Sequence, residues 1–397
     1  MTTRRHPRVL AVVRRFKWQH IDLLLALAQE VDLFVAYSVE GHEGAVARGR
    51  RQGLSLEDLG TPADPDEGDL VDGLSAVVTR TRPDLVHVLY YQHEALTVRL
   101  RAVLGDGTPL VFECRDPITT LRGARPGEPT WRREADALRS ADAWIVVSDA
   151  LLRYYERSHG LATPDVLVVP HAFAAATAAP PVPKLSAADG RVHLALVGTA
   201  SEYPRASRWY PDIIRSLVAQ GLVVHSHFHE SSPEVVATYD DLGREVPDYH
   251  PHPTVPFRVG TQLADLTSRY DLMGVFHQLD AAHNEAATLA VCLPTKAVSG
   301  WFHGAIPVVT TAHYGGIVER IERWGIGFVV PGVDALPTEV FDQQAIAAAT
   351  QACLAVRDEF SQETAARRVA AFHRALLARG GPWGREAGNA PPSVQGA

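Results

Sequence analysis

The feature that most constrains the fold is the alternation of short apolar runs with longer segments of helical period. Runs rich in Val, Ile and Leu, such as 8–13, 84–91 and 143–148, are separated by segments whose apolar residues recur every three or four positions. Near-continuous apolar strands are typical of parallel sheets that helices cover on both faces. The sequence therefore predicts an α/β protein built from βαβ units.

The alternation runs through the chain twice, on either side of an Ala- and Pro-rich stretch that lacks apolar period and is typical of a linker. Two domains also suit a chain of 397 residues, because single cores rarely grow beyond about 250–300 residues. Two Rossmann-like, doubly wound domains direct the carboxyl ends of their strands toward a common cleft, where ligands bind. We predict domains over 1–173 and 191–360, a linker over 174–190, a helix over 361–379 that packs back on the first domain, and a disordered tail over 380–397.

Composition narrows the possible partners. The formal net charge of -8 argues against nucleic acid as the main partner, because contacts to phosphates need a basic surface. Cys114, Cys292 and Cys353 form no CxxC pair and imply neither a disulfide framework nor a cysteine zinc site. No apolar run approaches the roughly 20 residues of a membrane-spanning helix, and no signal-peptide cleavage site follows the first residues. The sequence predicts a cytoplasmic protein without membrane contact and leaves its oligomeric state open.

Lys296 is one of only three lysines in a chain that otherwise uses arginine for positive charge. It lies in the first turn of a predicted helix, where Thr295 is available to cap the free N–H groups. Because a helix N-terminus carries partial positive charge and unpaired donors, a lysine there makes an anion site suited to phosphate. The alternative is an ordinary exposed lysine near a helix start.

The segment that begins at Lys296, KAVSGWFHGAIPVVTTAHYGGIVERIERWGIGFVV, resembles the donor-side motif of the retaining, family 4 type glycosyltransferases with the GT-B fold (glycosyltransferase group 1 family). In that motif a helix that ends in Gly leads into a PVV strand, a Gly-Gly loop and a helix that bears a Glu. The matching residues are Gly304, Pro307, Val308, Val309, Gly315, Gly316, Glu319, Gly325 and Gly327. Further matches at 140–149, 167–172 and 194–201 follow in the expected order.

The resemblance implies that the second domain binds a nucleotide-diphosphate sugar, with a UDP-sugar as the expected donor, and that the first domain binds the acceptor. It places Gly198 at the end of the first strand of the donor domain, with Arg205 or Arg208 in the next loop to bind the diphosphate. Arginine can grip phosphate through two N–H groups; the alternative for either residue is a surface arginine. The other implied donor residues are Thr295, Lys296, Gly315, Gly316 and Glu319.

The implied mechanism is transfer with retention and without a clear enzymic nucleophile. Lys296, an arginine and a helix dipole stabilise the leaving diphosphate, which is electrostatic preorganisation. The resemblance therefore implies no metal and no cofactor beyond the nucleotide-sugar co-substrate.

The sequence departs from the family pattern at two places. Ser299 or Gly300 stands where the family usually has a second glutamate that grips the donor ribose, so ribose binding is rebuilt elsewhere, for example at Glu319, or the donor site is altered. Arg115 and Asp116 stand where a histidine is common in the first domain. His87 and His93 flank the preceding strand and are alternatives to it. We predict a catalytic set of His93, Arg115 and Asp116, and we count Ser299 among the donor residues.

A long segment, 276–296, leaves a strand of the second domain at its carboxyl end. We predict that His283, Asn284 and Glu285 of this segment overhang the donor pocket and contact sugar hydroxyls, because long loops in compact domains are often functional. The alternative is that these residues only form caps and turns.

Three other patterns imitate functional sites. His225, His227 and His229 share one strand face, with His250 and His252 nearby, but a straight strand spreads its side chains, so cleft or packing histidines are expected and not zinc. The acidic stretch 64–67 lies in a Pro-rich loop and predicts a solvated loop. The arginines between 122 and 133 are offset by acidic neighbours and predict a solvated surface.

The resulting hypothesis is a retaining hexosyltransferase that acts on a hydroxyl of a small-molecule acceptor, for example in secondary-metabolite biosynthesis. One alternative is a catalytically weak protein that keeps the fold for binding or scaffolding, which Ser299 and Arg115 would explain. Another is a nucleotide-sugar epimerase, which acts without an acceptor.

Overall fold

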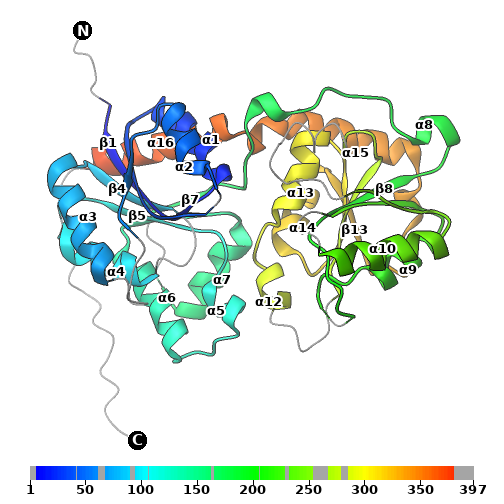
Figure 1. Ribbon diagram of the computed structural model, residues 1–397, viewed down its shortest axis with the longest axis horizontal. Coiled ribbons are helices and arrows are strands. Elements are labelled where there is room, and N and C mark those ends of the chain that lie inside the picture. Colours follow the sequence, from blue (N-terminus) through cyan, green and yellow to red (C-terminus); the bar gives the residue numbers. More distant parts are fainter. Residues whose placement is uncertain are drawn as a thin grey trace, which may run out of the picture.

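The structure, a computed structural model, describes residues 6–41, 43–60, 68–89, 94–105, 107–161, 165–204, 206–228, 232–253, 267–278 and 285–379. Within these ranges the chain forms two parallel sheets with their helices, which lie side by side (Figure 1). The predicted α/β class with two Rossmann-like, doubly wound domains is confirmed.

The first sheet has seven strands in the order β3-β2-β1-β4-β5-β6-β7, and its pairings are parallel. Its strands are β1 (Arg8–Phe16), β2 (Asp32–Glu40), β3 (Leu56–Asp58), β4 (Leu85–Leu89), β5 (Leu110–Cys114), β6 (Ala143–Val146) and β7 (Asp165–Val168). Its helices are α1 (Trp18–Ala28), α2 (Ala45–Arg51), α3 (Gly68–Thr81), α4 (Glu94–Leu104), α5 (Ile118–Arg122), α6 (Pro129–Ser140) and α7 (Asp149–His159). Every residue of β4, β5 and β6 is buried, as expected for central strands of a sheet covered on both faces.

A connecting segment follows, with the short helices η1 (Ala175–Thr177) and α8 (Ser186–Asp189). It is fastened to the second domain by Lys184, whose Nζ donates to the Ser268 carbonyl oxygen at 2.9 Å. Ser186 Oγ also donates to Asp271 Oδ1 at 2.5 Å. The predicted linker therefore packs along the second domain instead of standing free.

The second sheet has six strands in the order β10-β9-β8-β11-β12-β13, and its pairings are also parallel. Its strands are β8 (His193–Gly198), β9 (Val223–Phe228), β10 (Tyr249–Pro251), β11 (Leu272–Val275), β12 (Val308–Thr311) and β13 (Gly327–Val330). Its helical elements are α9 (Pro211–Ala219), α10 (Pro233–Glu245), α12 (Glu285–Leu289), α13 (Thr295–Ser299), the π-helix η2 (Gly300–Gly304), α14 (Gly315–Trp324), η3 (Thr338–Val340), α15 (Gln343–Val356) and η4 (Arg357–Phe360).

The last helix, α16 (Gln362–Ala378), returns to the first domain, as Figure 1 shows, and packs against α1. Its buried Val369 and Ala370 belong to the same apolar cluster as Val9 of β1 and Ile21 of α1. The chain thus crosses between the domains twice, once after β7 and once before α16.

Several elements differ from the predicted ones. α2, β3, α10 and β10 were not indicated by the sequence, and α12 occupies part of the segment that was expected to be a loop. The sequence also predicts a helix over 258–270, from its apolar period, and most of that segment lies outside the described residues. The tail 380–397 and the acidic stretch 64–67 lie outside them entirely.

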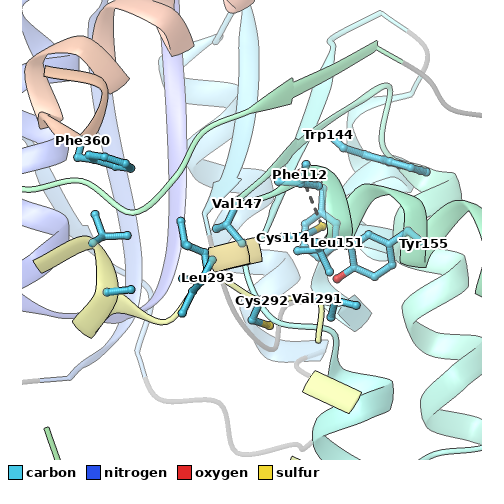
Figure 2. Close-up of a cluster of buried hydrophobic side chains, with 14 of the residues drawn as sticks. Phe112, Cys114, Trp144, Val147, Leu151, Tyr155, Val291, Cys292, Leu293 and Phe360 are labelled. Atoms are coloured by element: carbon cyan, nitrogen blue, oxygen red, sulfur yellow. Dashed lines mark hydrogen bonds between the residues drawn. The ribbon is translucent and has the colours of Figure 1, made fainter. Parts of the chain in front are cut away.

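The two domains share one apolar cluster (Figure 2). Val147, Leu151 and Tyr155 of the first domain belong to it together with Val291 and Leu293 of the second, all of them buried. Because apolar burial stabilises a contact roughly in proportion to its area, this cluster holds the two domains together at the point where the chain approaches Lys296.

Candidate functional site

The strand order of the second sheet identifies the edge at which a ligand is expected. The order runs away from β8 through β9 to β10 on one side and from β11 through β12 to β13 on the other. β8 and β11 are neighbours, so the topological switch point lies between them. In open parallel sheets the crevice at this point, outside the carboxyl ends of the strands, is the usual ligand site.

Gly198 and Lys296 meet at this edge. Gly198 ends β8 with φ +127, a backbone conformation that strongly favours glycine. A Cβ added there would lie 4.0 Å from Lys296 Cδ. Lys296 Nζ lies 3.3 Å from Tyr210 Oη, 3.4 Å from the Phe276 carbonyl oxygen and 5.7 Å from the centre of the Tyr210 ring. The lysine is therefore held over the ends of both central strands.

The start of α13 differs from the expectation in one respect. Thr295 is the first residue of the helix, Pro294 occupies the N-cap position, and α13 makes no side-chain cap hydrogen bond within the described chain. The predicted capping by Thr295 is wrong, because a proline precedes it and takes the position from which a side chain would cap. The helix continues as a π-turn over Gly300–Gly304, a form that often accompanies functional sites.

Arg208 brings a second positive charge to the same edge. Its Nη1 donates to Thr199 Oγ1 at 2.6 Å, directly after Gly198. Burial, followed by the charges of Lys296 and Arg208, lowers the pKa of His277 to about 2. Both cations therefore lie near this imidazole, which is neutral at physiological pH.

Three residues of this site were missed by the sequence reasoning: His277, Tyr210 and Tyr314. His277 Nδ1 lies 2.5 Å from Tyr314 Oη, and both tyrosines are almost fully buried. His277 follows the apolar run of a central strand, and that position was the available signal. The tyrosines come from separate segments, and only the folded chain brings Tyr210 to Lys296 and Tyr314 to His277.

The glycine pair of the donor motif begins α14. A Cβ at Gly315 would lie 2.3 Å from the Ala290 carbonyl oxygen, and one at Gly316 would lie 2.6 Å from the Cys292 carbonyl oxygen. Any side chain at either position would collide with this backbone. The close passage of residues 290–292 is thus a packing reason for both glycines, and it stands beside the predicted donor contact.

Glu319, the residue proposed to bind the ribose, and Ser299, counted among the donor residues, each have a buried oxygen. Glu319 pairs with Arg153 of α7, while its Oε2 is buried and has no hydrogen-bond partner among the described residues. Ser299 is 3% exposed, and its Oγ is likewise without a partner in the part of the chain that the structure describes. Buried polar atoms are normally paired, so these two oxygens are exceptions within the described part of the chain.

On the first domain, Arg115 lies in a buried charge network. Its Nε donates to Glu113 Oε1 at 2.5 Å, and its Nη1 donates to His171 Nδ1 at 2.8 Å. Burial would raise the pKa of Glu113, but Arg115 and His87 together hold it well below its ordinary value. Burial first, and then the Arg115 charge, lower the pKa of His171 to about 3. Since His171 accepts through Nδ1, it is a neutral imidazole with its proton on Nε2.

The remaining predicted site residues are placed as follows. Asp116 lies beside Cys292 of the second domain, where it adds to the effect of burial in raising the pKa of that thiol. Four predicted residues lie outside the described residues: His93, Arg205, His283 and Asn284.

The histidines of β9 form a hydrogen-bonded row away from the switch point. His193 Nδ1 lies 2.9 Å from His225 Nε2, and His225 Nδ1 lies 3.0 Å from His252 Nε2. His227 Nε2 lies 2.7 Å from Tyr270 Oη. Among the described residues, no group of three or more His, Cys, Asp or Glu could hold a metal ion. These histidines therefore pack and bond to one another.

The basic segment between residues 122 and 133 is solvent-exposed, and its arginines lie on the outer side of α5 and α6. Over the described part of the chain, the helices are too short or too polar to span a bilayer.

Two Rossmann-like domains joined by a linker and a returning C-terminal helix, with a cationic edge at the switch point of the second sheet, define a GT-B fold protein. Residues 18–172 match the family described as "Glycosyl transferase 4-like domain". The first domain thus matches the glycosyltransferase 4-like family, in agreement with the family resemblance seen in the sequence, and the chain as a whole has the GT-B fold.

Solved structures with the same fold include HepE of Anabaena in complex with UDP, which is 15% identical with a TM-score of 0.67 over 93% of this chain and 100% of that one. Sucrose-phosphate synthase from Thermosynechococcus elongatus is 13% identical, with a TM-score of 0.65 over 94% and 100% of the two chains. The lipopolysaccharide outer core galactosyltransferase WaaB is 11% identical, with a TM-score of 0.61 over 92% and 99%. No curated protein sequence matches the chain significantly. Identities this low support a common fold and do not carry over the ligands of those proteins.

Proposed function

We propose that this protein transfers a hexose from a nucleotide-diphosphate sugar, a UDP-sugar in the first instance, to a hydroxyl group of a small-molecule acceptor, with retention of anomeric configuration. The observation that carries the proposal is the convergence of Lys296 and Arg208 on His277 at the carboxyl ends of β8 and β11. Two cations at this edge suit a diphosphate, because charge-assisted hydrogen bonds to phosphate are the strong ones.

In the proposed reaction the bond between the sugar C1 and the diphosphate oxygen breaks, and negative charge develops on the leaving diphosphate. Lys296 and Arg208 are fixed where that charge grows, so they stabilise the transition state without reorganising. The acceptor hydroxyl attacks C1 from the same face, and its proton passes to a departing phosphate oxygen. Protein cations supply the positive charge that a metal ion supplies in other transferases, so we expect no metal requirement.

The solved structures with the same fold suggest which donors to test first. HepE of Anabaena was solved with UDP and, in another structure, with UDP-glucose, and WaaB is a galactosyltransferase. These proteins share the fold with this chain, and they make UDP-hexoses the first donors to test. Within the proposed division of labour, the domain over 191–360 holds the donor, and the one over 1–173 holds the acceptor.

On the acceptor side we propose that Arg115 does not contact the substrate itself and instead orients Glu113 and His171. Its guanidinium is engaged by Glu113 and His171, so it fixes the tautomer of His171 instead of reaching freely into the cleft. Asp116, next in the chain and beside Cys292 of the donor domain, is the nearer candidate for a contact with the acceptor hydroxyl.

The test is calorimetric titration of the purified protein with UDP, GDP, ADP and TDP, each with and without EDTA. We expect selective binding of one nucleotide, UDP, that EDTA does not alter, followed by turnover when the matching sugar donor and an acceptor panel are supplied. Absence of binding to all four nucleotides would refute the proposal. Loss of binding in EDTA would refute its metal-free form.

A second candidate function is binding of the nucleotide sugar without efficient transfer. It is favoured by the position where the family usually has a second glutamate, which Ser299 or Gly300 occupies here without a carboxylate, and by Arg115 in place of a histidine. Hydrolysis or transfer of the bound donor would count against this candidate. Incubation with donor alone also separates an epimerase, which converts the sugar without an acceptor, from a transferase.

A further inference from the structure

The chain segment that leads to Lys296 is enclosed between the two domains. On the first-domain side, Ser148 is 0% exposed, and its Oγ donates to the Val291 carbonyl oxygen at 2.6 Å. The start of α14 lies beside both, since a Cβ at Gly316 would be 2.6 Å from the Cys292 carbonyl oxygen and 3.3 Å from Ser148 Cβ. The backbone at 290–292 is therefore in close contact with Ser148, directly after the first-domain strand β6, and with the start of α14.

The hydroxyl of Ser148 makes two hydrogen bonds, one as donor and one as acceptor. It accepts a hydrogen bond from Leu151 N at 3.1 Å, which caps α7, and it donates its proton to the Val291 carbonyl oxygen. A serine hydroxyl has only one proton to donate, so the direction of the bond to Val291 is fixed. The capped helix thus holds the hydroxyl in the orientation that grips the donor domain.

Two more hydrogen bonds cross the boundary at the same place. Arg320 of α14 donates through Nη2 to the Val147 carbonyl oxygen at 2.8 Å and through Nη1 to the Gly316 carbonyl oxygen at 2.9 Å. Thr288 Oγ1 donates to Thr120 Oγ1 at 2.8 Å. Val147 and Ser148, directly after β6, therefore contact both the segment before Lys296 and helix α14, which follows β12.

Apolar packing makes this connection stiff. Val291 and Cys292 are buried beside Leu151 and Tyr155 of α7, as Figure 2 shows. Only two residues separate Leu293 from Lys296, and one of them is Pro294, whose ring fixes its own φ. The position of Val291 therefore largely sets the position of the lysine.

We propose that Ser148, a residue of the first domain, is a positioning residue for the donor site: by holding the Val291 carbonyl it sets the Lys296 ammonium against the donor diphosphate. The inference rests on the proposed function, because it assigns Lys296 to that diphosphate. It adds that donor binding depends on a contact made by the acceptor domain, although Ser148 touches no part of the donor edge itself.

The test compares Ser148→Ala with Ser232→Ala. Ser232 is also an N-cap serine, whose side chain accepts from Val235 N at the start of α10, so both variants lose a helix cap and only the first loses an interdomain hydrogen bond. We expect the Kd for UDP to rise about three- to tenfold in Ser148→Ala, the range for one lost hydrogen bond, and to stay unchanged in Ser232→Ala. Equal Kd values in Ser148→Ala and wild type would overturn the inference.

A double-mutant cycle shows whether Ser148 acts through Lys296. In a Lys296→Ala background, Ser148→Ala should leave the remaining UDP affinity unchanged, because the group that it positions is absent. A further loss by the same factor in that background would mean that Ser148 only supports the fold, and it would overturn the inference.

Ser148→Cys is used if Ser148→Ala does not fold. A thiol is only a weak hydrogen-bond donor, so this variant weakens the bond to the Val291 carbonyl oxygen while keeping a side chain of similar size, and we expect a rise in Kd in the same direction. Binding equal to wild type in a folded Ser148→Cys protein would overturn the inference in that case. If the wild type itself binds no nucleotide, the proposed function is overturned, and the role of Lys296 falls with it.

Discussion

Replacing Lys296 with alanine separates a functional lysine from a structural one. Its ammonium lies 3.3 Å from Tyr210 Oη and 3.4 Å from the Phe276 carbonyl oxygen, both at the long end of the hydrogen-bond range. The side chain is only half-buried. We therefore expect Lys296→Ala to lower the free energy of unfolding by less than about 1 kcal/mol.

The expected effect on binding is larger. A hydrogen bond between charged groups contributes about 1.5–3 kcal/mol, which corresponds to a roughly ten- to hundredfold rise in the Kd for UDP. Calorimetric titration measures this directly, and chemical denaturation of the same samples measures stability. The matched control is Arg215→Ala, which removes one positive charge from an exposed ion pair on α9 in the same domain and should leave the Kd unchanged.

Either of two outcomes would refute the reasoning. If Lys296→Ala binds UDP as tightly as the wild type, the lysine does not contact the diphosphate. If Arg215→Ala weakens binding as much as Lys296→Ala does, the effect comes from the net charge of the domain and not from the geometry at the switch point. A fall in stability of several kcal/mol in Lys296→Ala would instead assign the lysine a structural role.

Three further predictions concern acid stability, packing and the ribose. Burial and neighbouring histidines lower the pKa of His225 and His227 from 6.5 to about 3. Between these pH values the unfolded chain binds protons at both histidines and the folded chain does not, so the free energy of unfolding should fall from pH 6.5 toward pH 3 in urea titrations. The fall should be less steep when both histidines are replaced by Gln. Gly316→Ala should cost about 1–3 kcal/mol by overpacking in thermal unfolding, whereas Gly107→Ala, where a Cβ meets nothing within 4 Å, should cost far less. Glu319→Gln should raise the Kd for UDP severalfold while changing the free energy of unfolding by less than about 1 kcal/mol; unchanged affinity would argue against a ribose contact.

Much of the fold was predictable because its central strands are buried on both faces. The runs at β4, β5 and β11 are mostly apolar and buried throughout, and this leaves few alternatives to a parallel sheet. β10 escaped prediction because it is a three-residue edge strand that ends at Pro251, and an edge strand needs no continuous apolar run. α10 escaped because the helix is largely polar and buries only Val235, Tyr239 and Leu242.

The site was predictable only where one segment carries it. Lys296 and Gly198 stand out locally, one as a rare lysine and the other as the end of an apolar run. Lys296 and Gly198 lie close together only because β8 pairs with β11, and the local sequence of neither segment predicts the strand order. The same holds for His277, whose environment is set by Lys296 and Arg208 from two other parts of the chain.

The glycine pair of the family motif illustrates how one short pattern can serve packing and binding together. Gly315 and Gly316 leave room for the backbone at 290–292, and that backbone is gripped from the first domain by Ser148. The same segment runs on to Lys296. A side chain at either glycine would therefore displace the lysine as well as the helix start, so loss of donor binding in a glycine variant does not by itself identify a ligand contact. Only a comparison with Lys296→Ala, in which the backbone is undisturbed, distinguishes a glycine that touches the donor from one that makes room for the residue that does.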